Sequence, residues 1–142
     1  MKRRERTRVL VEGRRELLSR IAHEAERVHE IRTVKEPTEE LVMLKVREGA
    51  QRSLFYLGEA LATTCTVRIG SHYGYGMVLG EDREKAHDLA VVDAAYSLDE
   101  ELCRLNGWTE EIAQEGQRLD EDLRRRREAL IKTQVDFSTM EA

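Results

Sequence analysis

Apolar and polar positions alternate most clearly between residues 54 and 80, and this pattern predicts strands. From residue 61 to 69 the odd positions form the more apolar set, namely Leu61, Thr63, Cys65, Val67 and Ile69. This period of two, rich in β-branched residues, indicates a strand with one buried face. A short apolar run, 54–57, precedes it, and Gly58 with Glu59 between the two indicates a bulge or a sharp bend.

The next strand is predicted after Gly70, with a second apolar set at Tyr73, Tyr75, Met77 and Leu79. A two-residue turn would pair Ile69 with His72 and would place the two apolar sets on opposite faces. A three-residue loop pairs Ile69 with Tyr73 and brings the sets together. Because the buried face sets the register of a strand, the pattern predicts the three-residue loop.

Two glycines, Gly74 and Gly76, interrupt this second strand and indicate close packing against a neighbouring strand or helix. Their spacing with Gly80 is not a dinucleotide fingerprint, because it lies within a strand rather than at a strand-to-helix turn.

A helix is predicted from Arg83 to about Leu105, with Asp82 as its cap. Residues 89–96 are apolar on nearly every side, and Asp93 is the exception. Since a buried carboxylate must be paired or hydrogen-bonded, we expect Asp93 to tie down a nearby backbone turn. A role in a shared active site and simple surface exposure are the alternatives.

The remaining strands and helices follow from shorter patterns. Ile31 to Glu36 is a predicted strand ended by Pro37, Leu41 to Arg47 is another, and residues 48–53 connect the hairpin. Amphipathic spacing predicts a helix from Arg14 to Val28, preceded by a short one that Gly13 interrupts.

The C-terminal part of the chain reads as one further helix after the stop signal Asn106-Gly107, with Thr109 as its cap. Its narrow apolar stripe suits one partner helix better than a deep core, and comprises Ile112, Gly116, Leu119, Leu123 and Leu130. The predicted fold is α+β: a small, mostly antiparallel sheet of three to five strands (about residues 31–80), packed with N-terminal helices and two C-terminal helices. We expect one domain over residues 1–142, with a basic arm at 1–8 and a partner-docking tail at 133–142.

Charge narrows the classes of function. Charged residues make up 37% of the 142 residues and aromatic residues only 5%, which suits long exposed helices or surfaces that a partner covers. The net charge of −4 argues against a nucleic-acid-binding protein as a whole, although the basic arm, a frayed segment or a first helical turn, keeps that alternative open.

Arg124, Arg125, Arg126 and Arg127 are the densest run of charge. An acidic residue lies four positions before each of the first three, which predicts three ion pairs along a solvated helix. Contact with a substrate or with a partner's acidic face is the alternative.

Little in the sequence points to a cofactor. Cys65 and Cys103 lack the spacing of a metal site and imply no disulfide, and the chain has no P-loop. We expect no metal and no cofactor bound by the chain alone. Without a signal peptide or a transmembrane span, the chain is expected in the cytoplasm, away from membranes.

Several pieces, in order, resemble the PhnG family, a subunit of the bacterial carbon–phosphorus lyase machinery. They are the run 54–59, Val67 to Ile69, the glycine-spaced segment 74–82, and Ala86 with Ala90, Asp93 and Ala94. The closing segment 135–140 is similar to the family's Val-Asp-Phe-Phe-Thr-Met, with Ser138 in place of the second aromatic residue. The likeness spans about residues 7 to 140.

This resemblance implies a two-fold hetero-oligomer with PhnH, PhnI and PhnJ. With PhnI, PhnH and PhnL, such a subunit takes part in joining a phosphonate to ribose C1 of MgATP, with release of adenine. MgATP is then a substrate of the complex, the nucleosidase chemistry is attributed to PhnI, and no established catalytic residue carries over.

An enzyme acting alone is the alternative from another class, with Asp93, Glu59 and His72 as its candidate residues. Displacing adenine needs a carboxylate near the developing cation and an acid at the leaving base, and neither Asp93 nor Glu59 has an obvious partner in the sequence. A third alternative is a nucleic-acid binder that uses the basic arm. The docking candidates are Arg124 to Arg127 and, in the apolar tail, Val135, Asp136, Phe137, Thr139 and Met140.

Overall fold

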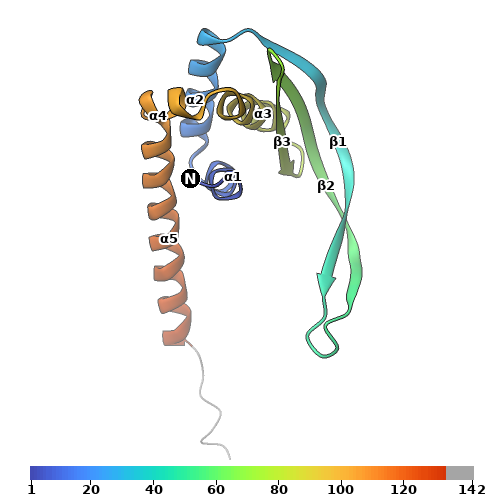
Figure 1. Cartoon of the computed structure of the whole chain (residues 1–142). Coiled ribbons are helices and arrows are strands. Elements are labelled where there is room, and N and C mark those ends of the chain that lie inside the picture. The colour runs from blue at the N-terminus through green and yellow to red at the C-terminus, as the bar shows by residue number, and fades with distance from the viewer. Residues whose placement is uncertain (134–142) are drawn as a thin grey trace, which may run out of the picture.

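The computed structural model describes residues 1–133 and confirms the α+β fold (Figure 1). Its elements are α1 (Arg3–Glu12), α2 (Arg15–Val28), β1 (Ile31–Arg47), β2 (Leu54–Ile69), β3 (His72–Leu79), α3 (Arg83–Leu98), α4 (Glu100–Leu105) and α5 (Trp108–Thr133). Within the described residues the strands form one antiparallel sheet in the order β1-β2-β3. Helix α1 begins at Arg3, so most of the basic arm predicted at residues 1–8 belongs to this helix.

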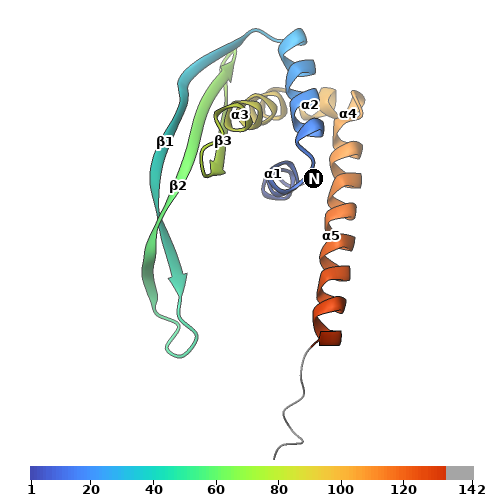
Figure 2. The ribbon, with the colours of Figure 1, turned by 180° about the vertical axis from the view of Figure 1, so that it is seen from behind.

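Helix α3 is the centre of the fold, packing on β3 and β2 with one side and on α2 with another (Figures 1 and 2). As the apolar pattern predicted, every residue from Leu89 to Tyr96 is buried. The core runs from the sheet through α3 to α2 and on to α1 and α5, and it includes Val67, Val91, Ile21, Val9 and Ile112.

The predicted three-residue loop between β2 and β3 is wrong. Ile69 pairs with His72 across a two-residue turn, and Gly70 has a φ of 57°, which suits the tight turns of hairpins. The apolar set from Tyr73 to Leu79 consequently faces outward, and Gly74, Gly76 and Val78 face the core.

Close approach of α3 is the physical reason for this register. A Cβ on Gly74 would lie 2.0 Å from the carbonyl oxygen of Ala90, and one on Gly76 would lie 1.8 Å from that of Ala86. Only glycine fits there, so the inner face of β3 is nearly devoid of side chains. The prediction that these glycines allow close packing is confirmed.

Strand β1 runs through Pro37, where the sequence predicted an end. A register shift between Lys35 and Thr38 contains the proline, and another lies just before it, between Thr33 and Lys35. Because β1 is an edge strand, a residue without an N–H is tolerated at such an irregularity.

The bulge predicted near Gly58 is confirmed. Leu44 pairs with Gly58 and Lys45 with Tyr56, so Leu57 is the extra residue.

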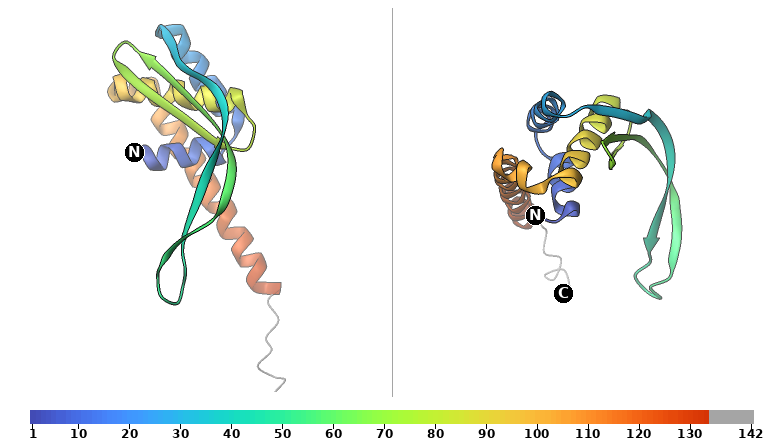
Figure 3. Two further views of the ribbon diagram at one scale, coloured as in Figure 1. Left: turned by 90° about the vertical axis from the view of Figure 1, so that its right-hand side faces the viewer. Right: turned by 45° about the horizontal axis from the view of Figure 1, so that its top comes forward.

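Strand β3 ends opposite Ala62 of β2. The part of β2 that precedes Ala62 pairs with β1 alone, so the sheet has only two strands there. We call residues 41–61, the two-stranded part with its connecting turn, the ribbon. It extends away from the helical body, as does the second half of α5, and the two diverge in the side view (Figure 3, left).

Two details of the C-terminal helices differ from the sequence prediction. The helix predicted to reach Leu105 breaks at Asp99, whose carboxylate accepts a hydrogen bond from the backbone N–H of Leu102 and so caps α4. Thr109 lies inside α5 rather than capping it, and its hydroxyl contacts that of Tyr96 instead. The predicted stop at Asn106-Gly107 is confirmed, with a φ of 80° at Gly107.

Candidate functional site

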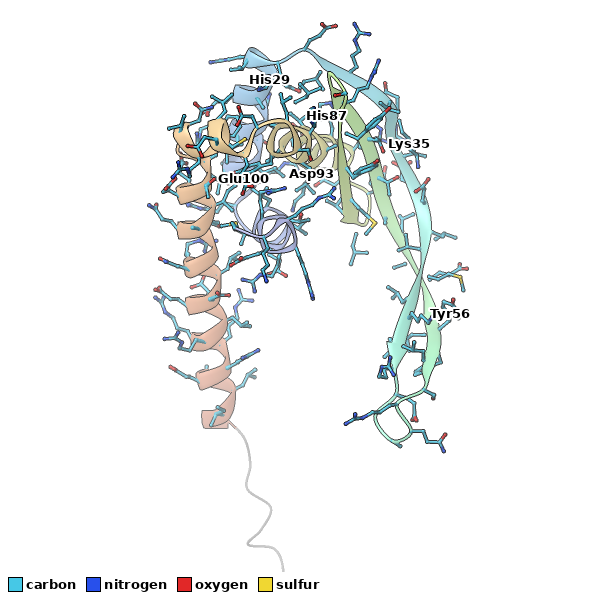
Figure 4. All side chains as sticks on the ribbon, in the orientation of Figure 1. His29, Lys35, Tyr56, His87, Asp93 and Glu100 are labelled. Carbon is cyan, nitrogen blue, oxygen red and sulfur yellow. The ribbon has the colours of Figure 1, made fainter. Side chains whose placement is uncertain are left out.

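Asp93 is buried on α3 and holds three parts of the chain together (Figure 4). Its carboxylate accepts hydrogen bonds from the Arg3 guanidinium at 2.9 and 2.6 Å and from the Arg6 guanidinium at 3.2 Å. It also accepts one from the backbone N–H of Tyr75 at 3.0 Å. The expectation of a backbone tie is met, although the partner is the middle of β3 rather than a turn.

The arginines around Asp93 are held by aromatic rings as well. The Arg6 guanidinium lies 4.1 Å from the centroid of Tyr96, and that of Arg3 lies 5.9 Å from the centroid of Tyr75. The hydrogen bond to Asp93, followed by its charge, raises the pKa of Arg3. A carboxylate fixed by two guanidiniums and an amide is suited to positioning, and it lacks a free lone pair directed at a substrate.

The three residues proposed for a stand-alone enzyme do not come together. His72 pairs with Ile69, ten residues along β2 from Glu59, so roughly 33 Å of strand separates the two positions. Tyr75, the contact of Asp93, pairs with Thr66, again far from Glu59. Glu59 is exposed on the ribbon opposite Met43.

His72 lies at the tight turn and is half-buried. Its Nδ1 is buried and has no hydrogen-bond partner among the described residues. No acidic residue that the sequence singled out lies within its hydrogen-bonding reach, so the geometry offers it no partner for acid–base chemistry.

The arginine run on α5 forms fewer ion pairs than predicted. Of the three expected pairs only Arg125 with Glu121 is present, at 3.7 Å. Asp120 pairs with Arg8 instead, at 2.8 Å, and Asp122 with Arg118 at 3.0 Å. The prediction of three pairs is wrong because it considered one helix alone, whereas α1 and the preceding turn of α5 compete for the same acids.

Arg124, Arg126 and Arg127 are exposed and form no ion pair within residues 1–133. They stay candidates for contact with a partner. The tail candidates Val135, Asp136, Phe137, Thr139 and Met140 lie outside the described residues.

Glu115 on α5 is a second buried carboxylate, and the sequence reasoning missed it. It accepts hydrogen bonds from the backbone N–H and the guanidinium of Arg14, each at 2.9 Å, and from the guanidinium of Arg118 at 2.6 and 3.0 Å. Arg118, followed by the Arg14 amide, lowers the pKa of Glu115 to about 2. The sequence did contain an indication of this burial. Glu115 lies on the apolar stripe of its helix, beside Gly116, just as Asp93 lies among the apolar residues of α3.

A third cluster joins α2 and α3. Asp88 is buried and accepts a hydrogen bond from the Ser19 hydroxyl at 2.8 Å, and His87 lies 3.8 Å from its other oxygen. The neighbouring Asp88 carboxylate raises the pKa of His87. These contacts again join helices, and sequence spacing gave no signal that Ser19 and Asp88 would meet.

Neither cysteine forms part of a ligand set. Cys65 and Cys103 are buried free thiols, and burial raises the pKa of each to about 11. Among residues 1–133 no group of three histidine, cysteine or acidic side chains is placed to hold a metal ion. A cavity of about 370 Å³ lies between α1 and α5, and its walls alternate in charge, with Arg8, Glu12, Arg118, Asp120, Asp122 and Arg126.

None of the helices within the described part of the chain combines the length and the apolar character needed to cross a membrane.

The fold and these clusters define an α+β protein whose buried acids fasten helices to the sheet and to one another. The model of the family described as phosphonate metabolism protein PhnG matches residues 1–141, and the chain belongs to that family. A relative from Rhizobium meliloti (strain 1021) is 34% identical over 112 residues, which cover 78% of this chain and 70% of the relative. That relative is named alpha-D-ribose 1-methylphosphonate 5-triphosphate synthase subunit PhnG.

Proposed function

We propose that this chain is an accessory subunit of the synthase that joins a phosphonate to ribose C1 of MgATP and releases adenine. The observation that carries the proposal is the family match over residues 1–141, together with the name of the 34% identical relative. The companion subunits are homologues of PhnI, PhnH, PhnJ and PhnL, in a cytoplasmic hetero-oligomer with two-fold symmetry. MgATP is a substrate of the complex, and this chain alone holds no cofactor.

The geometry supports an accessory role over a catalytic one. The reaction needs a carboxylate near the ribose cation and an acid at the departing base, both within contact of one substrate. Here Asp93 is saturated by Arg3, Arg6 and Tyr75, while Glu59 lies on the ribbon. The surroundings of Asp93 and Glu59 are therefore those of a framework residue and a surface residue.

The basic arm gives little support to a nucleic-acid binder. Arg3 and Arg6 are both engaged with Asp93, and Arg8 with Asp120. Phosphate binding by these residues would leave Asp93 buried without its partners.

Reconstitution tests the proposal. The chain is purified alone and co-expressed with the four companion subunits, and adenine release from MgATP and methylphosphonate is measured for the full set, the set without this chain, and the chain alone. We expect release only from the full set. Release from the chain alone would favour a stand-alone enzyme, and undiminished release without it would remove the chain from the reaction.

We also propose that the tail docks on the PhnI homologue, because its apolar side chains Val135, Phe137 and Met140 follow a highly charged helix. Deleting residues 135–142 should weaken co-purification with that subunit and leave the melting temperature of the isolated chain unchanged. A matched control replaces the same eight residues by a Gly/Ser sequence of equal length. Equal recovery of the partner with the intact and the deleted chain would rule out this docking role.

A further inference from the structure

The ribbon exposes the largest collection of apolar side chains within residues 1–133. Nine large apolar residues lie on it, each at least 38% exposed: Leu41, Met43, Leu44, Val46, Leu54, Phe55, Tyr56, Leu57 and Leu61. The strand register places five of them, Leu41, Met43, Leu54, Tyr56 and Leu61, on one face of the ribbon. Taking about half of a large side chain's surface for each, that face exposes on the order of 500 Å² of apolar surface, at the upper end of the about 300–600 Å² of the largest patch on a typical monomer. A stable protein–protein interface takes roughly 800 Å² from each partner, polar and apolar surface together, so this face would supply a large share of one.

One face of the ribbon continues the face of the sheet that α3 covers. Alternation along β2 places Leu61 on the same side as the buried Thr63 and Cys65, and Leu61 pairs with Leu41. Helix α3 packs where β2 has β3 beside it, and Figure 4 shows Tyr56 far from that helix. The ribbon therefore continues a sheet face that α3 covers in the helical body. Within the described residues, no helix covers this face along the ribbon.

The ribbon is also poorly suited to stand alone in water. A two-stranded antiparallel pair is marginally stable by itself, and long apolar edges invite wrong pairing. Neither of its faces is covered within the described residues, since no residue from 41 to 61 is buried and only Val42, Glu48 and Ala60 are half-buried.

Charge at the tip of the ribbon indicates what kind of surface fits it. Lys45, Arg47 and Arg52 lie there and form no ion pair within residues 1–133. Lys45 lies 5.6 Å from the centroid of the Tyr56 ring, and Arg47 donates a hydrogen bond to the carbonyl oxygen of Arg52. One carboxylate, Glu48, lies at the tip with these three cations and accepts a hydrogen bond from the backbone N–H of Gln51. The remaining excess of positive charge at the tip, in a chain of net charge −4, favours a partner with carboxylates at the matching positions.

We propose that the ribbon is the docking surface of this chain for a chemically different subunit of the synthase, one that presents an apolar surface bordered by carboxylates. The inference rests on the proposed function and specifies which part of the chain makes the complex. A second copy of the chain fits less well. Glu39 and Glu40 at the base of the ribbon are already paired with Arg83 and Lys35, and Glu48 at the tip accepts a hydrogen bond from the Gln51 amide. Among the described residues of the ribbon and its base this leaves Glu59 alone to face the three cations of another tip.

The test compares two matched double variants of the full chain in binding to the co-purified companion subunits. Leu41→Ser/Tyr56→Ser changes the ribbon, and Val28→Ser/Leu105→Ser changes equally exposed apolar residues on the helical body. We expect the ribbon variant to lose at least tenfold in affinity and the body variant to stay within about twofold. Circular dichroism melts of both isolated variants should overlay that of the wild type, because none of the four residues belongs to the core.

A second pair of variants examines the charges. Lys45→Glu/Arg47→Glu should weaken binding and flatten its dependence on NaCl concentration, whereas Arg4→Glu/Arg27→Glu, equal in charge change, should do neither. Loss of binding in the ribbon variants alone supports the proposal.

The same measurements distinguish three outcomes that would overturn one or both proposals. If wild-type chain binds the companion subunits and adenine is released, yet the ribbon variants bind equally well, the ribbon proposal is overturned and the proposed function stands. If the isolated wild type is a dimer that the ribbon variant converts to a monomer, the surface belongs to a second copy and the proposal is overturned. If the wild type neither binds nor supports adenine release, the proposed function fails with it.

Discussion

At the scale of single residues, Asp93 joins α1, α3 and β3 through one carboxylate. Replacing it with Asn keeps an acceptor for the Tyr75 amide and removes the charge that Arg3 and Arg6 need. Since Arg6 is buried, its guanidinium would be left without a counter-charge, and we expect a loss of about 3–5 kcal/mol in the free energy of unfolding. Urea unfolding followed by circular dichroism measures it.

Asp120→Asn is the matched control for Asp93→Asn. It breaks the ion pair with Arg8, in which both side chains are exposed to solvent, so the expected loss is several-fold smaller than for Asp93→Asn. Similar losses for the two variants would show that Asp93 is not the tie described above.

Glu115 gives a pH dependence with a definite sign. Its pKa is about 2 in the folded chain against 4.5 for the free side chain, so the unfolded state binds more protons between these values. The stabilisation is present above about pH 4.5 and is lost as the pH falls toward about 2. Allowing for the exposure of Arg14 and Arg118, we expect about 2 kcal/mol from this group.

Chemical unfolding of the wild type and of Glu115→Gln at pH 2.5, 3.5, 4.5 and 6 checks this pH dependence. The gap in stability between the two proteins should be widest at pH 6 and narrowest at pH 2.5. A gap that is constant over this range would mean that Glu115 titrates normally.

At the scale of elements, the contact between α3 and β3 depends on the absence of side chains. Gly76→Ala would bring a methyl group to 1.8 Å from the carbonyl oxygen of Ala86, so helix and strand must separate. Overpacking of this kind costs about 1–3 kcal/mol or more, and thermal unfolding should show a clearly lower midpoint. Gly49→Ala in the ribbon turn, with nothing within 4 Å of the added carbon, should leave the midpoint nearly unchanged.

The same contact explains which elements the sequence could predict. Where burial was carried by side chains, as from Leu89 to Tyr96 and from Thr63 to Ile69, apolar periodicity gave the correct element and face. On β3 burial was carried by glycines, so the apolar set from Tyr73 to Leu79 indicated the wrong face and the wrong turn. The continuity of β1 across Pro37 depends on its place at the sheet edge, which no local pattern contains.

The candidate site was predictable to a similar extent. An acid within an apolar helix face identified Asp93 as a buried, paired residue, and the same criterion applied to α5 would have identified Glu115. The guanidinium partners that are distant in the chain come from α1 for Asp93 and from the turn after it, as Arg14, for Glu115. Such pairs, about 90 to 101 residues apart in the chain, follow from tertiary packing rather than from local sequence.

At the scale of the whole molecule, the body and the ribbon should differ in local stability although one strand passes through both. Residues 63–69 of β2 are hydrogen-bonded on both sides and covered by α3, whereas residues 54–61 pair with β1 alone. Opening the ribbon exposes little further apolar surface, so it should open with a free energy well below that of global unfolding. Hydrogen exchange followed by mass spectrometry should therefore show amides of 54–61 exchanging at least tenfold faster than those of 63–69.

Because both segments belong to β2, the strand contains its own control. Exchange in 54–61 should slow on addition of the companion subunits while that in 63–69 stays the same, and uniform protection along β2 in the free chain would contradict this division.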